Sequence, residues 1–146
     1  AKNKPEFDMY FIAFSGEDAN LRGSDWYVEH PIVPLSQIKF LFNLDMIADN
    51  NPKQYCEFND VAMEGYALFE RINAEKGYFE ALDRHDLDEN SDHWPFAKKN
   101  VPVVFFMNEH GDAYKYYHTV HDTYQNHIST NYEPSFKIIE DFIKRY

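Results

Sequence analysis

Three stretches of the chain are apolar at successive positions, and each has the length of a strand. They are residues 9–15, 38–47 and 101–107. A short run that is apolar on both faces and rich in aromatic or β-branched side chains is typical of a strand buried inside a sheet. We therefore expect these segments to form buried strands of one sheet, the first of them central, with a further short strand at residues 55–58.

Helical spacing of apolar positions predicts the elements between and after these strands. Residues 61–76 show this spacing and are followed by Gly77, which is typical of a helix end. A shorter helix is expected over residues 25–29, because Pro31 stops it. Pro134 opens a final helix. The expected buried face of that helix consists of Phe136, Ile139, Ile143 and Tyr146.

Acidic or histidine-rich residues follow all three apolar strands. Glu17 and Asp18 come directly after the first strand, Asp45 lies at the end of the second, and residues 109–122 form a loop dense in tyrosine and histidine after the third. Strands separated by helices favour an α/β sheet covered on both faces. In such sheets ligands bind at the carboxyl ends of the strands, so the sequence predicts a functional site there.

The composition narrows the possible functions. The chain has 146 residues, of which 44% are hydrophobic, and 25 acids against 14 bases give a net charge of −11. Such an acidic surface repels phosphate backbones, so we expect no nucleic-acid partner. No apolar run reaches the ~20 residues that span a bilayer, and we expect no membrane span. Because Cys56 is the only cysteine, any metal must be held by histidine and carboxylates.

Each candidate residue also has an ordinary structural interpretation. Adjacent acids such as Glu17 and Asp18 usually belong to a solvated turn. Asp45 lies among apolar residues, where an unpaired carboxylate is costly; a helix cap or a paired acid explains it as well as a metal does. A lone histidine such as His118 is most often a surface or core residue. His93 is open between a ligand, a substrate contact and an orienting group.

The order and spacing of five motifs resemble one family. These motifs are Gly16-Glu17-Asp18, Leu21-Arg22-Gly23-Ser24, Asn43-Leu44-Asp45-Met46-Ile47, Ser91-Asp92-His93 and His118-Thr119-x-x-Asp122-Thr123. From about Met9 to about Ile128, the sequence resembles the twenty-eighth metallopeptidase family, the co-catalytic zinc exopeptidases. That superfamily includes bacterial leucyl aminopeptidases, glutamate carboxypeptidase, glutaminyl cyclases and the transferrin receptor ectodomain.

The resemblance implies a role for the matched residues. Glu17 takes the place of the general base, which accepts a proton from the attacking water and returns it to the leaving amine. Asp18 takes the place of a zinc ligand that is usually Glu in the family. His118 matches the last ligand, on the same metal as Asp18, and Asp45 matches the ligand of the other zinc.

The resemblance also implies the surroundings of the site and the fold. Asp92 and His93 match a motif that lines the site, and Tyr117, from a tyrosine cluster, is expected in packing or in the wall of the substrate pocket. Two zinc ions are expected in the complete domain. The expected fold is α/β with three layers (α/β/α) around a mixed, largely parallel sheet, of the phosphorylase/hydrolase-like kind.

One part of the family pattern does not occur in this sequence. The family places a His-x-Asp motif and a metal-bridging Asp upstream of the Glu-Asp pair. The 16 residues before Glu17 contain no histidine, and Asp8 lies too close to the first strand to be either acid. We therefore expect residues 1–146 to be the C-terminal portion of a single zinc-peptidase catalytic domain, and this portion to bind zinc weakly or not at all.

The leading hypothesis is a metallo-aminopeptidase, a hydrolase that removes N-terminal residues from peptides. Gly23-Ser24 after the acid pair resembles the aminopeptidases more than the cyclases. A glutaminyl cyclase or a carboxypeptidase of the same superfamily remains an alternative, as does a non-catalytic binding domain on that fold. Bacterial relatives are often exported, so an extracytoplasmic (periplasmic or secreted) location is expected by resemblance.

Overall fold

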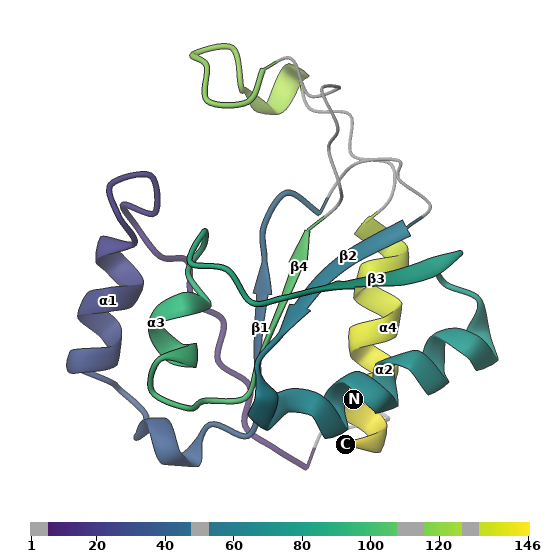
Figure 1. Cartoon of the computed structure of the whole chain (residues 1–146). Helices are drawn as coiled ribbons and strands as arrows, with labels where there is room; N and C mark the ends of the chain where they lie inside the picture. Colours follow the sequence, from purple (N-terminus) through teal and green to yellow (C-terminus); the bar gives the residue numbers. More distant parts are fainter. Residues whose placement is uncertain (1–5, 48–52, 108–115, 127–131) are drawn as a thin grey trace.

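The computed structural model describes residues 6–47, 53–107, 116–126 and 132–146 (Figure 1). The described helices are α1 Arg22–Glu29, α2 Met63–Lys76, α3 Trp94–Ala97 and α4 Tyr132–Arg145. The described strands are β1 Leu41–Leu44, β2 Lys53–Phe58, β3 Ala81–His85 and β4 Val103–Met107. Short 3-10 helices lie at Leu35–Gln37, Asp60–Ala62 and Tyr124–Asn126. No helix within these ranges is both long and apolar enough to cross a bilayer.

The four described strands form one mixed sheet in the order β1-β4-β2-β3. β1 runs parallel to β4, β2 runs parallel to β3, and the two pairs meet through the antiparallel neighbours β2 and β4. The predicted mixed sheet is thus confirmed. Because β1 and β4 are parallel, their carboxyl ends lie at the same edge, which is where the predicted site was expected.

Helices cover both faces of this sheet, as the sequence predicted. α1 and α3 lie on one side and α2 and α4 on the other (Figure 1). Side chains of β4 alternate between the two layers, since successive residues of a strand point to opposite faces. Val104 and Phe106 pack into the cluster under α2 and α4, whereas Val103 packs with residues of α1 and α3.

Aromatic rings form much of the core under α2 and α4. Phe69 of α2 stacks on Phe142 of α4 with ring centroids 4.3 Å apart and planes 12° apart. Both rings are almost fully buried. Gly65 of α2 makes room for a further ring, because a Cβ at this position would overlap Phe40. Burial of such large rings supplies most of the apolar area that stabilises a domain of this size.

Helix α4 buries a different face from the one expected. Ser135, Ile138 and Phe142 are its buried residues, whereas Phe136 is 64% exposed. The sequence of α4 carries two neighbouring apolar stripes, one residue apart, and helical spacing alone does not distinguish them. Packing against α2 selects the stripe of Ile138 and Phe142, because that stripe meets the aromatic core there.

The prediction that residues 9–15 form a central strand, and that this strand is buried, is wrong in both respects. Residues 9–14 form no strand, and no backbone hydrogen bond joins them to another described residue. Phe11 is 88% exposed and Tyr10 61% exposed. The apolar pattern is real, but no described strand lies beside this segment to complete a ladder. Only Phe14 reaches the core, where its ring contacts those of Tyr27 and Phe96.

The other expected elements are found, with shifted ends. The apolar run at 38–47 contributes only Leu41–Leu44 to the sheet. The helix expected over 25–29 begins three residues earlier, at Arg22. Helix α2 ends as predicted: Gly77 is left-handed with φ of 64°, and its N–H donates to the carbonyl of Asn73 at 2.8 Å. This is the usual way in which glycine ends a helix.

Candidate functional site

A tight turn presents Glu17 and Asp18 beside the start of α1. Gly16 is left-handed with φ of 70°, a conformation that glycine adopts without strain. The backbone N–H of Gly23 donates to the carbonyl of Ser15 at 2.9 Å. A Cβ on Gly23 would lie 2.5 Å from that carbonyl oxygen. The close approach of α1 to the turn therefore requires glycine at this position.

Glu17 lies in the electrostatic field of all the predicted ligands. Burial raises the pKa of Glu17 above its ordinary value of 4.5. Four neighbours also act on this pKa: the carboxylates of Asp45, Asp18 and Asp92 raise it, and His118 lowers it. A general base needs a pKa that is moved toward the working pH. The candidate ligands Asp18, Asp45 and His118 therefore all influence the pKa of the candidate base, although they come from three separate segments.

Asp18 and His118 form an exposed pair. Nε2 of His118 lies 3.3 Å from Oδ1 of Asp18, with side chains 61% and 79% exposed respectively. The ring of Tyr117 stacks on that of His118, with centroids 3.8 Å apart. His118 is left-handed with φ of 55°, which is uncommon for a residue other than glycine. The two residues predicted to share one metal thus meet at the surface of the protein.

Asp45 is placed by the end of β1 and by a serine from a distant loop. Its backbone N–H donates to the carbonyl of Phe106 on β4 at 3.2 Å. Its Oδ2 accepts a hydrogen bond from Oγ of Ser91 at 2.9 Å. Met46 directly after it is left-handed, with φ of 53°. Strained residues of this kind concentrate at functional sites.

Asp92 ties the Ser-Asp-His motif to α1. The hydroxyl of Ser24, which is fully buried, donates to Oδ1 of Asp92 at 2.6 Å. Burial raises the pKa of Asp92 above its ordinary value of 3.8, more than the hydrogen bond from Ser24 lowers it. Two of the motifs found in the sequence are therefore in direct contact, although 68 residues separate them.

His93 does not line an open pocket. Its side chain is fully buried and stacks on Phe105 of β4 with ring centroids 4.6 Å apart. Nε2 lies 3.4 Å from Oε2 of Glu57 and 3.1 Å from the carbonyl oxygen of Asp88. The expectation that His93 lines the site is therefore corrected to a position inside the core. Imidazole is accepted there because polar partners face both of its nitrogens.

Sequence reasoning missed Glu57, which is also fully buried. Burial raises its pKa, but hydrogen bonds from His93, the backbone of Asp88 and the hydroxyl of Tyr55 outweigh this, and the pKa lies below 4.5. The sequence contains a signal for this buried acid, because Glu57 stands between Cys56 and Phe58 in a strand. An unpaired buried carboxylate is as costly at Glu57 as it is at Asp45.

The described residues match zinc in donor type and fall short in number. Zinc prefers imidazole nitrogen and carboxylate oxygen when thiolates are lacking, and Asp18 and His118 supply one of each. Within residues 6–47, 53–107, 116–126 and 132–146, no group of three or more histidine, cysteine or acidic side chains lies close enough to hold a metal. Asp45 lies near this pair, since it acts on Glu17, but is not grouped with it.

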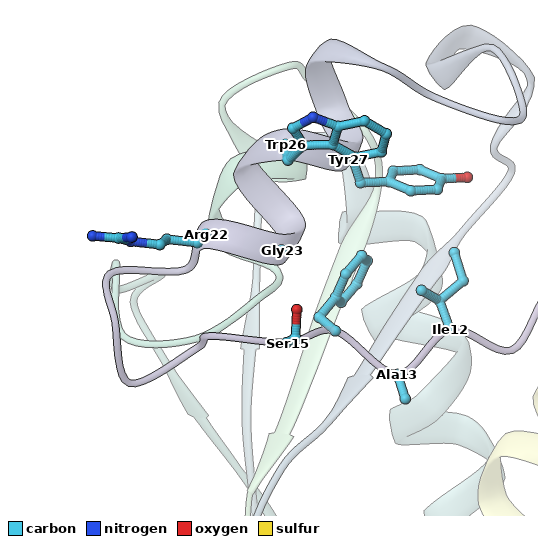
Figure 2. A pocket seen from close by; sticks show the side chains of 8 residues that line it. Ile12, Ala13, Ser15, Arg22, Gly23, Trp26 and Tyr27 are labelled. Carbon is cyan, nitrogen blue, oxygen red and sulfur yellow. The ribbon is translucent and has the colours of Figure 1, made fainter.

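A shallow hollow of about 420 Å³ lies between α1 and the segment before Glu17 (Figure 2). Its lining residues are Ile12, Ala13, Phe14, Ser15, Arg22, Gly23, Trp26 and Tyr27. None of the predicted site residues belongs to this lining. Arg22 extends away from the aromatic residues of α1 in Figure 2. The hollow is therefore a feature of the neighbouring surface and not the predicted catalytic pocket.

Comparisons with known proteins give one family and several similar folds. The sequence matches the model of peptidase family M28 over residues 1–143. A search of curated proteins gave no match. LapA from Legionella pneumophila, of which a second structure is described as LapA aminopeptidase, is similar with a TM-score of 0.77 at 20% identity. That match covers 99% of this chain and 41% of LapA.

Two further solved structures share the fold. An aminopeptidase from Aneurinibacillus sp. strain AM-1 gives a TM-score of 0.66 at 19% identity, covering 90% of this chain and 31% of that protein. BSAP, a zinc aminopeptidase from Bacillus subtilis, gives 0.61 at 23% identity, covering 91% and 33%. The chain therefore spans less than half the length of each of these proteins.

Proposed function

Because this chain belongs to peptidase family M28, we propose that it supplies the general base and metal-binding side chains of a zinc-dependent aminopeptidase. The observation that carries the proposal is the electrostatic neighbourhood of Glu17. Asp18, Asp45, Asp92 and His118 all act on its carboxyl group, although they come from segments far apart in the sequence. A single solvated turn does not require such convergence.

The proposed roles follow from the position of each side chain. Asp18 and His118 would hold one zinc ion, and Asp45 would contribute to a second. Zinc, when bound, lowers the pKa of a coordinated water and polarises the scissile carbonyl. Glu17 accepts the proton of the attacking water and passes it to the leaving amine. Its raised pKa suits both halves of that transfer, because it is moved toward neutral pH.

The charge around Glu17 favours an aminopeptidase over a carboxypeptidase. Of the four neighbours that act on its pKa, three are carboxylates and one is a histidine. Zinc ions would neutralise Asp18 and Asp45, which leaves Asp92 to attract the α-ammonium group of a peptide and to repel a terminal carboxylate. We therefore place the N-terminus of the substrate at this edge of the sheet.

The test compares Glu17→Gln with a matched control in the complete enzyme. Glu29→Gln removes an acid from the same region, at the end of α1, where Glu29 is exposed and paired only with Lys99. Aminoacyl-anilide hydrolysis is measured for both variants, together with bound zinc. We expect Glu17→Gln to lower kcat roughly 10²–10⁴-fold with zinc retained, and Glu29→Gln to leave activity unchanged.

Three results would contradict the proposal. Full activity in Glu17→Gln would remove the general base. A protein that ignores aminoacyl anilides while trimming peptides from the carboxyl end, or cyclising N-terminal glutamine, would point to the other activities of the superfamily. A complete enzyme that never takes up zinc would belong to the non-catalytic binding domains.

A further inference from the structure

A buried imidazole bridges two strands over the ring of a third. Asn43 of β1 and Glu57 of β2 are both register partners of Phe105 on β4, one on each side. His93 stacks on Phe105 with the two rings 11° from parallel. From this position its two ring nitrogens reach outward over the neighbouring strands, Nδ1 to Asn43 and Nε2 to Glu57.

Among the residues that the structure describes, only acceptors face Nε2 of His93. The carbonyl oxygen of Asp88 lies 3.1 Å away and Oε2 of Glu57 lies 3.4 Å away. Glu57 is held as a carboxylate, because its oxygens also accept from the hydroxyl of Tyr55 at 2.7 Å and from the backbone N–H of Asp88 at 2.8 Å. A carboxylate has no proton to give. The proton between these groups must therefore reside on Nε2.

A donor faces Nδ1 on the opposite side of the ring. Nδ2 of Asn43 lies 3.4 Å from Nδ1 of His93 and 2.8 Å from Oγ of Ser91. The amide NH₂ group has two protons and no acceptor capacity, so it serves both partners. Ser91 then has its hydroxyl proton left for Asp45, whose Oδ2 lies 2.9 Å away. The hydrogen bonds therefore run outward from Asn43, through His93 to Glu57 in one direction and through Ser91 to Asp45 in the other.

We infer that His93 is a positioning residue, held as the neutral tautomer protonated on Nε2, and that it sets the direction of the hydrogen bonds that end on Asp45. An unprotonated Nδ1 keeps the NH₂ group of Asn43 pointing at His93 and Ser91. Ser91 is thereby left to donate to Oδ2 of Asp45, while Oδ1 accepts no hydrogen bond from another described residue. That free oxygen is the one available to a metal, a role for Asp45 that rests on the proposed function.

Moving the proton of His93 from Nε2 to Nδ1 would remove the hydrogen bond that holds Asp45. A proton on Nδ1 would need the carbonyl oxygen of Asn43 in place of its NH₂ group. The same oxygen would then face Ser91 at 2.8 Å and attract its hydroxyl proton. Asp45 would lose its hydrogen-bond donor and gain rotational freedom. Groups that orient a metal ligand in this way typically change metal affinity by about 10–100-fold when removed.

The first test reads the tautomer directly and needs neither zinc nor activity. The full chain is labelled with ¹⁵N-histidine, and long-range ¹H–¹⁵N correlations distinguish protonated from unprotonated ring nitrogens. The resonances of His93 are identified by their contacts with the ring of Phe105. We expect a protonated Nε2 and an unprotonated Nδ1 at neutral pH. A proton on Nδ1, in the other tautomer or in an imidazolium ion, would overturn the inference.

The second test reverses the chain with Asn43→Asp, which keeps the shape of the side chain and removes its donors. The matched control is Gln54→Glu, the same amide-to-acid change on the other face of the sheet, where Gln54 is buried and bonded to Ser135. Zinc affinity is measured by competition with a chromogenic chelator. We expect roughly 10–100-fold weaker binding for Asn43→Asp, protonation of Nδ1 of His93, and unchanged binding for Gln54→Glu.

The outcomes separate this inference from the proposed function. Unchanged or tighter zinc binding by Asn43→Asp would overturn the positioning role, and so would equal weakening by Gln54→Glu. A wild-type protein that binds no zinc contradicts the proposed function, while the tautomer of His93 still decides the direction of the hydrogen bonds. If Asn43→Asp does not fold, the spectrum of the wild-type chain still decides it.

Discussion

Replacing Gly23 with alanine is the sharpest perturbation of the turn that carries Glu17. The new Cβ would lie 2.5 Å from the carbonyl oxygen and 2.8 Å from the backbone nitrogen of Ser15. Both are backbone atoms, so no side chain can rotate out of the way. Opening the contact to 3.4 Å, where ordinary van der Waals contact begins, moves the turn and α1 apart by 0.9 Å.

Two opposing effects set the change in stability. Overpacking of this kind costs about 1–3 kcal/mol, and the separation stretches the 2.9 Å hydrogen bond from Gly23 to Ser15, which costs about 1 kcal/mol more. Alanine is favoured over glycine inside a helix by about 1 kcal/mol. We therefore expect a net loss of roughly 1–3 kcal/mol in the free energy of unfolding.

The effect on catalysis should be comparable in free energy to the effect on stability. A displacement of about 1 Å at a reacting group lowers rates by about 10²-fold, and Glu17 lies two residues after Ser15. The assay combines urea unfolding with kcat/KM for aminoacyl-anilide hydrolysis by the complete enzyme. Gly77→Ala is the control, because Gly77 is left-handed with φ of 64° and has open space around it. Alanine there costs about 1–2 kcal/mol and should leave kcat/KM unchanged. Wild-type activity and stability in Gly23→Ala would refute the reasoning.

Three further outcomes can be measured. The pKa of Glu57 is lower in the folded protein than its ordinary value of 4.5. The stability that Glu57 contributes is therefore present above pH 4.5 and is lost as the pH falls through the folded pKa. The urea midpoint, measured at decreasing pH from neutral, should show this loss in the wild type and less of it in Glu57→Gln. Phe142→Ala, which empties a buried site stacked on Phe69, should lower the free energy of unfolding by about 3–5 kcal/mol, and a change under 1 kcal/mol in thermal or urea unfolding would contradict the packing described. Tyr117→Ala should change the free energy of unfolding by no more than about 0.5 kcal/mol, because Tyr117 is 53% exposed. It should raise KM if the ring that stacks on His118 belongs to the substrate pocket. An unchanged KM would argue against that position.

The elements that the sequence predicted correctly depend on local signals. Helix α2 is an example, because its apolar spacing and Gly77 both belong to the helix itself. The same holds for β4, whose residues Val103–Phe106 are buried on both faces. In each case the pattern that specifies the element lies within the element, so no knowledge of neighbours is needed.

Errors arose where the outcome depends on a partner. Residues 9–14 have the composition of a buried strand, but a strand also needs a neighbouring backbone, and the composition does not reveal whether one is present. The buried stripe of α4 was misassigned for the same reason, since α2 selects between two adjacent stripes. The motif assigns His93 to the lining of a pocket only by its order along the chain, whereas Glu57 and Phe105, which enclose it, lie elsewhere in the sequence.

The sequence proposes a set of residues for the candidate site, but it does not predict the contacts between them. The family resemblance implies that Glu17, Asp18, Asp45 and His118 belong to one site, and their roles stay predictions. The hydrogen bond from Ser24 to Asp92 and the chain through Asn43 join residues tens of positions apart. Such contacts depend on how distant segments pack against one another, which the local sequence pattern does not specify.

The two faces of the sheet differ in the kinds of buried residues that they carry. Under α2 and α4 lies a broad layer of aromatic and aliphatic residues, whereas the face under α1 and α3 carries Glu57, Ser91 and His93 among a smaller apolar cluster. Apolar packing accepts many exchanges that keep its volume, but a directed series of hydrogen bonds accepts almost none. Substitutions on the side of α2 and α4 can therefore change the stability of the domain without disturbing the hydrogen-bonded residues on the side of α1 and α3.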